Sequence, residues 1–175
     1  MESFETMLTG GHPNSLGKTI EVVDIILEDK SKLEELYQCY FSNDEVVRLR
    51  TSNAFKRICK EDKSWLTPYI DKFLEEISKI DQASTQWTIA QLFLELTAQM
   101  STDQIGKAKT ILKKNLINHN DWIVLNTTIK TLASWSKKDP DLKKWIKPHL
   151  DKISMDSRKS VSSTAKKAIL QLYKS

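Results

Sequence analysis

The feature that most constrains the fold is an apolar stripe that recurs four times in 175 residues. Its first copy falls on one side of an α-helix, because its members are spaced at i, i+4, i+7, i+8 and i+11. The copies are Val47, Thr51, Ala54, Phe55 and Ile58, then Thr85, Ile89, Leu92, Phe93 and Leu96, then Val124, Thr128, Thr131, Leu132 and Trp135, then Val161, Ala165, Ala168, Ile169 and Leu172. A stripe of this kind has to be buried, so each helix must pack against a partner.

Helix breakers between the stripes predict the partner helices. We expect pairs at 31–41 with 44–60, 64–80 with 83–99, 102–117 with 120–137 and 140–153 with 156–174, after a leading helix at 15–28. Two similar stretches, "WLTPYIDK" at 65–72 and "WIKPHLDK" at 145–152, share Trp, Pro, Asp and Lys and support a repeat. Pro68 and Pro148 are expected in the first turns of their helices, where a missing N–H costs little.

The stretch "NDEVVRLRTSNAF" resembles the opening of the second helix of a HEAT repeat, at Asp44, Val47, Arg48, Ala54 and Phe55. The resemblance extends over residues 31–175. It implies an all-α fold, a right-handed α-solenoid (HEAT/ARM-like superhelix) of about four helix pairs with an N-terminal capping helix. The expected single domain covers 1–175, with a turn and capping helix at 1–28 and repeats at about 31–60, 64–99, 102–137 and 140–174. The resemblance implies a scaffold rather than an enzyme, with second helices that line a concave surface.

Composition favours a soluble, helix-rich protein, with 39% hydrophobic and 29% charged residues. Neither an export signal nor an apolar run of about 20 residues is present, so we expect a cytoplasmic protein with no membrane partner. His12, His119 and His149 are scattered, and no zinc or nucleophile motif occurs. We therefore expect no enzymatic activity, no cofactor and no metal.

The stretch "GGHPNSLGKT" at Gly10–Thr19 invites comparison with a nucleotide-binding P-loop. Five residues separate Gly11 from Gly17 where the motif has four, and no buried strand precedes them, so we expect no nucleotide. A turn that leads into a helix near Leu16, capped by Asn14 or Ser15, is the favoured interpretation. A second interpretation stays open, in which free N–H groups beside Lys18 bind a carboxylate or phosphate of a partner.

Charge is distributed unevenly along the chain. Residues from 101 onward carry 16 Lys and Arg against 6 Asp and Glu, a net charge of +10, whereas the first 100 residues carry 11 against 17, a net of −6. A basic half attracts nucleic acid, acidic proteins or anionic surfaces. The alternative is that these lysines only solvate the outer faces of the helices.

The helix faces opposite the stripes predict the partner-binding surface. We expect apolar contacts from Trp87, Trp122, Leu49 and Leu94, and hydrogen bonds from Asn53, Gln91, Asn126, Lys130 and Lys167. The leading hypothesis is a non-catalytic module that binds a protein or peptide; in the alternative arrangement, Trp87 and Trp122 pack sideways against neighbouring helices. A second hypothesis is nucleic-acid binding, since Asp121 beside Trp122 resembles DNA alkylation-repair glycosylases built from HEAT-like helices. A third is a structural or regulatory subunit that docks its basic half on an acidic surface.

Overall fold

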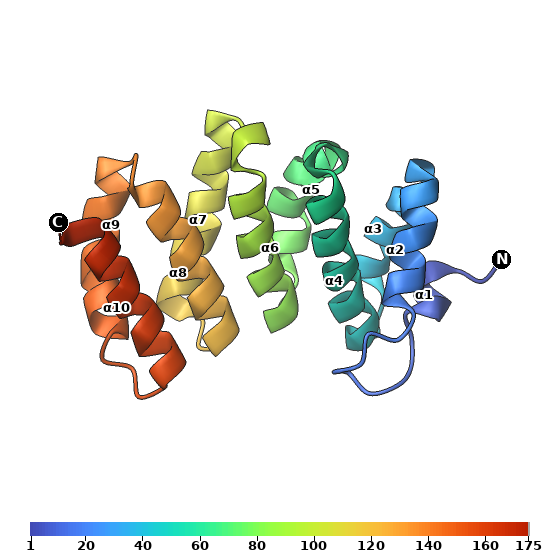
Figure 1. Ribbon diagram of the computed structural model, residues 1–175, viewed down its shortest axis with the longest axis horizontal. Helices are drawn as coiled ribbons and strands as arrows, with labels where there is room; N and C mark the ends of the chain where they lie inside the picture. Colours follow the sequence, from blue (N-terminus) through green and yellow to red (C-terminus); the bar gives the residue numbers. More distant parts are fainter. Residues whose placement is uncertain (175) are drawn as a thin grey trace. The chain divides into compact units, whose positions relative to one another are not determined.

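The computed structural model describes residues 1–174, which form helices joined by short turns and contain no strand (Figure 1). The α-helices are α1 (Phe4–Met7), α2 (Thr19–Glu28), α3 (Leu33–Gln38), α4 (Glu45–Glu61), α5 (Ile70–Glu75), α6 (Ala83–Glu95), α7 (Thr102–Asn118), α8 (Trp122–Ser136), α9 (Pro140–Ile153) and α10 (Lys159–Tyr173). Short 3-10 helices span Lys30–Lys32, Cys39–Phe41, Lys63–Tyr69, Ile77–Lys79 and Thr97–Gln99.

Burial of the four stripes confirms the helical repeat. All twenty stripe residues are buried except Ile169, which is half-buried. The all-α fold is therefore confirmed, with the stripes on α4, α6, α8 and α10. The chain divides into two compact units, Met1–Thr88 and Ile89–Ser175, and each is described separately. The single-domain organisation and the handedness of the repeat stay predictions.

An aromatic cluster joins the 3-10 helix Cys39–Phe41, α4 and α5 in the first unit. Tyr40 stacks on Phe55 with ring centroids 5.6 Å apart, and Phe73 meets Phe55 edge-on at 5.3 Å. The buried Tyr40 hydroxyl is satisfied by Ser52 Oγ at 2.8 Å. Edge-to-face and stacked rings add stability beyond the area they bury, so this cluster fixes how the three helices pack.

The N-terminal turn wraps around a buried arginine. Arg50, on α4, is only 1% exposed and donates hydrogen bonds to four backbone carbonyls, with no carboxylate among the partners. The acceptors are the carbonyl oxygens of Leu8 (2.9 Å), Gly10 (2.6 Å), His12 (3.2 Å) and Ser15 (3.2 Å). A P-loop directs N–H groups at an anion. Here the turn directs carbonyl oxygens at a cation, the opposite polarity.

The expected helix cap at Asn14 or Ser15 is wrong. Helix α2 begins at Thr19, and Ser15 Oγ instead accepts a bond from the Gly17 N–H at 3.2 Å. Asn14 donates its backbone N–H to His12 Nδ1. The physical reason is that the carbonyls at 8–15 are committed to Arg50, which holds residues 10–18 in a turn and delays the helix by about one turn relative to the expected start.

Four helices, α7 to α10, dominate the second unit, and side-chain caps fix the starts of the first three. Ser101 and Gln104 form a capping box on α7, and Asp121 caps α8 by accepting from the N–H groups of Ile123 and Val124. Asp139 caps α9 through the Leu142 N–H at 3.0 Å. These caps satisfy backbone donors that have no partner inside the helix, so the sequence sets where each of these three helices begins.

The two similar octapeptides fold differently, which corrects the expectation for Pro148. Residues 65–72 lie in a 3-10 helix followed by α5, whereas 145–152 lie inside α9. Because Asp139 caps α9 and Pro140 occupies its first turn, Pro148 lies well inside the helix rather than near its start. Pro148 is solvent-exposed, so its ring lies on the outer side of α9.

Candidate functional site

One face of α8 carries an exposed tryptophan and two exposed lysines, together with two buried residues. Trp122, Asn126, Lys130, Ala133 and Lys137 follow one another at spacings of three or four residues, opposite the buried stripe of this helix. Trp122 is 51% exposed, and Lys130 and Lys137 are exposed. This face therefore combines an exposed aromatic ring with two cations.

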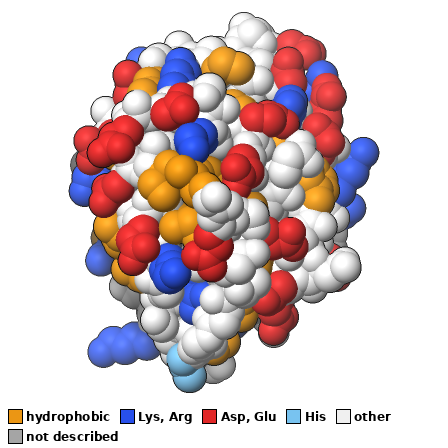
Figure 2. Space-filling model, turned by 90° about the vertical axis from the view of Figure 1, so that its right-hand side faces the viewer, with side chains coloured by type: hydrophobic (Ala, Val, Ile, Leu, Met, Phe, Trp, Pro, Cys, Tyr) orange, Lys and Arg blue, Asp and Glu red, His pale blue; other side chains and the backbone are white. Residues whose placement is uncertain are grey.

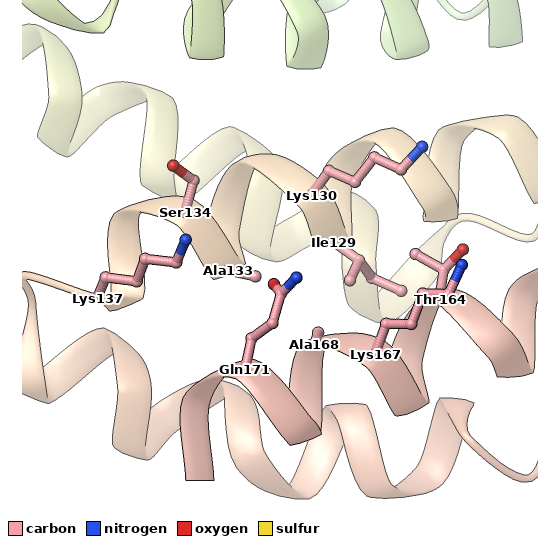
Figure 3. A pocket seen from close by; sticks show the side chains of 9 residues that line it. All are labelled: Ile129, Lys130, Ala133, Ser134, Lys137, Thr164, Lys167, Ala168 and Gln171. Atoms are coloured by element: carbon pink, nitrogen blue, oxygen red, sulfur yellow. The ribbon is translucent and has the colours of Figure 1, made fainter. Parts of the chain in front are cut away.

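A pocket lies between this face and α10 (Figure 3). Figure 3 shows the lining side chains, which come from α8 and α10. The pocket has a volume of about 260 Å³. The lining residues are Ile129, Lys130, Ala133, Ser134 and Lys137 from α8 and its end, and Thr164, Lys167, Ala168 and Gln171 from α10. The lining combines three apolar residues, three lysines, two hydroxyl groups and one amide.

The three pocket lysines, Lys130, Lys137 and Lys167, have no acidic partner among residues 1–174. Other lysines of the same unit are engaged. Lys109 pairs with Asp139 and Lys147 pairs with Asp151. The hydrogen bond from Lys109 holds the pKa of Asp139 below its usual value. Three lysines without an acidic partner in the described residues thus line one pocket.

The pocket is built to attract an anion. Three like charges around one cavity repel each other, and an anionic group that enters relieves this repulsion. The pocket contains no acidic side chain. The hydroxyls of Ser134 and Thr164 and the amide of Gln171 supply further hydrogen-bond donors, so a carboxylate or phosphate finds donors on both helices.

The structure brings together four of the polar and aromatic residues expected at the binding surface. Lys130 and Lys167 line the same pocket, and Trp122 lies on the same face of α8. Asn126 also lies on this face, but it is only 8% exposed and donates its amide to Ser160 Oγ of α10 at 2.7 Å. Asn126 therefore links α8 to α10, where an exposed hydrogen-bond donor was expected.

The other expected residues lie on α4 and α6. In the first unit, Leu49 and Asn53 are half-buried on α4, and Asn53 Oδ1 accepts a bond from Arg57 Nε at 2.7 Å. Trp87 is half-buried in the part of α6 that belongs to the same unit. In the second unit, Gln91 and Leu94 are half-buried on the remainder of α6. None of these five residues lines the pocket between α8 and α10.

Sequence reasoning missed Lys137, Ser134, Thr164 and Gln171. The expected face of α8 stopped at Ala133, and one more helical turn along the same face reaches Lys137. Periodicity could therefore have found this lysine. Predicting Thr164 and Gln171 would have required knowing which side of α10 packs beside α8. That side is determined by tertiary structure, which the local sequence pattern does not specify.

Neither a metal-binding cluster nor a membrane-spanning helix is found among residues 1–174. No group of three or more His, Cys, Asp or Glu side chains in this part of the chain is arranged to hold a metal ion. None of the helices there has the length and apolar character required to cross a membrane.

Paired helices with buried stripes and a partly exposed face define a helical repeat protein of the interaction type. The model of the HEAT repeat domain matches residues 12–173, and the chain therefore belongs to the HEAT repeat family. Proteins of this family are generally non-catalytic scaffolds. No curated protein and no solved structure matched this chain.

Proposed function

We propose that this chain is a non-catalytic interaction module that binds an acidic segment of a protein partner at the α8–α10 face. The α8–α10 face consists of Trp122, Lys130, Lys137, Thr164, Lys167 and Gln171. The observation that carries the proposal is the convergence of three lysines without acidic partners on one pocket.

The features of this face favour a peptide over a nucleic acid. Tight binding to duplex DNA uses many phosphate contacts, about six to ten in typical cases. The pocket offers three lysines together with the apolar residues Ile129, Ala133 and Ala168, with the exposed ring of Trp122 on the same helix face. Aromatic and apolar groups bordered by polar ones are typical of protein-binding hot spots. A segment with acidic and apolar side chains matches this combination.

Charge reversal in the pocket tests the proposal. We expect the double substitution Lys130→Glu with Lys167→Glu to weaken binding of Asp- and Glu-rich peptides by about tenfold or more, since two favourable ion pairs become repulsive. The probes are an array of acidic peptides, matched neutral peptides and a labelled DNA duplex. Fluorescence polarisation then gives the dissociation constants.

The matched control is Lys144→Glu with Lys152→Glu on α9, which changes the net charge equally and lies outside the pocket. This variant should keep acidic peptide binding within about twofold of the wild type. Equal losses in both variants would show attraction to net charge alone and refute the proposed site. Binding of the duplex but of no peptide would replace the protein partner with nucleic acid.

A further inference from the structure

The outward face of α2 combines exposed apolar side chains with unpaired acidic ones. Ile20 is 41% exposed and Leu27 is half-buried, and both lie at the edge of the buried side of α2. Glu21, Asp24 and Glu28 lie next to them, on the side opposite the buried residues, and all three are exposed. Figure 2, which views the first unit from the side of α1 and α2, shows hydrophobic side chains bordered by acidic ones. These five residues are the α2 face.

The outward face of α10 has the complementary composition. Leu170 is 54% exposed and lies one turn beyond Lys166, on the same side of α10 as Lys159 and opposite the buried stripe. Neither lysine forms an ion pair within residues 1–174, and the acidic residues of the α2 face form none there either. Lys159, Ser163, Lys166 and Leu170 are the α10 face. It is distinct from the pocket, which is on the side of α10 that packs against α8.

We propose that the α2 face of one copy of this chain docks on the α10 face of a second copy. Each face presents one exposed apolar side chain, Ile20 or Leu170, that docking would remove from water, and the neighbouring charges of the two faces have opposite signs. A helix in a repeat protein normally packs against neighbours on both sides, and these two faces have no such neighbour in the described structure. Opposite charge selects the heterologous pairing, because α2 against α2 or α10 against α10 would bring like charges together.

This arrangement uses different surfaces on the two copies. A heterologous contact leaves one α2 face and one α10 face free in every pair, so association continues into a ring or an open chain. The contact depends on charge, so it should weaken as salt screens the two faces. The proposal does not depend on how the two units of one chain are arranged.

Sedimentation velocity of the full chain tests the proposal. At low ionic strength the weight-average sedimentation coefficient should rise with protein concentration, and high salt should suppress the rise. The variant Glu21→Lys with Glu28→Lys should remain monomeric, and so should Lys159→Glu with Lys166→Glu. An equal mixture of the two variants should regain association. The basic α2 face of the first variant then meets the acidic α10 face of the second, and the two unreversed faces also have opposite charges.

Two controls make the result specific. Glu45→Lys with Glu61→Lys reverses two exposed charges on α4 and should associate like the wild type. Lys130→Glu with Lys167→Glu should also associate, which separates this contact from the proposed peptide site. A wild-type chain that stays monomeric at all concentrations in low salt would overturn the proposal. Failure of the mixture to regain association would do the same, and circular dichroism checks that each variant is folded.

Discussion

We expect Arg50→Met to lower the free energy of unfolding by about 3 kcal/mol, the largest effect of any polar substitution proposed for this chain. The side chain is buried and its guanidinium donates to four carbonyls between residues 8 and 15. Methionine fills a similar volume but offers no donor. The cost stays below the sum of four charge-assisted hydrogen bonds, because the exposed turn at 10–18 opens and its carbonyls bind water.

Urea unfolding measures the loss, and the cleavage rate at Lys18 with trypsin measures opening of the turn. Arg57→Met is the matched control, since Arg57 is exposed on the same helix and bonds only to Asn53 in the described contacts. This control should cost about 0.5 kcal/mol or less and leave cleavage unchanged. Similar losses in the two variants would contradict the role assigned to Arg50.

Gly17→Ala should destabilise the protein by about 2 to 3 kcal/mol, the second large effect, for two additive reasons. Gly17 has φ +52°, a conformation that is unfavourable for alanine. A Cβ at this position would also lie 2.9 Å from Cζ of Arg50, which four hydrogen bonds hold in place. The substitution therefore strains the backbone and displaces the buried guanidinium.

Gly10→Ala separates the two causes. Gly10 has φ +80°, and a Cβ there meets no atom within 4 Å, so only the backbone penalty of about 1 kcal/mol applies. In the Arg50→Met background the extra cost of Gly17→Ala over Gly10→Ala should largely disappear. Equal costs for the two alanine variants in the wild-type background would show that close packing against Arg50 is unimportant.

Periodicity was sufficient to predict the repeated helices, because burial of a helix depends on local spacing. Val47, Leu92 and Leu132 are buried as expected, and each belongs to a stripe that the 3.6-residue period defines. The start of a helix could be predicted where the sequence contains a recognisable cap residue, as at Asp121. Pro148 was misplaced because an octapeptide likeness does not include the cap at Asp139 that starts the helix earlier.

The features that could not be predicted from the sequence depend on contacts between residues far apart in the chain. Arg50 meets carbonyls 35 to 42 residues away, and nothing in the local pattern of α4 identifies those acceptors. Asn126 has the spacing of an exposed residue, yet Ser160 of α10 covers and binds it. The basic half was visible from composition, whereas its unpaired lysines were not, because pairing at Lys109 depends on Asp139, 30 residues later.

The central claim is that acidic segments bind between α8 and α10. Its most direct test is a titration of the isotopically labelled chain with the acidic peptide that binds best in the array. NMR chemical shifts of the backbone amides are measured at each peptide concentration. The account predicts concentration-dependent shifts that cluster around Lys130, Lys137 and Lys167. Saturable binding with shifts confined to α4, and none on α8 or α10, would contradict it.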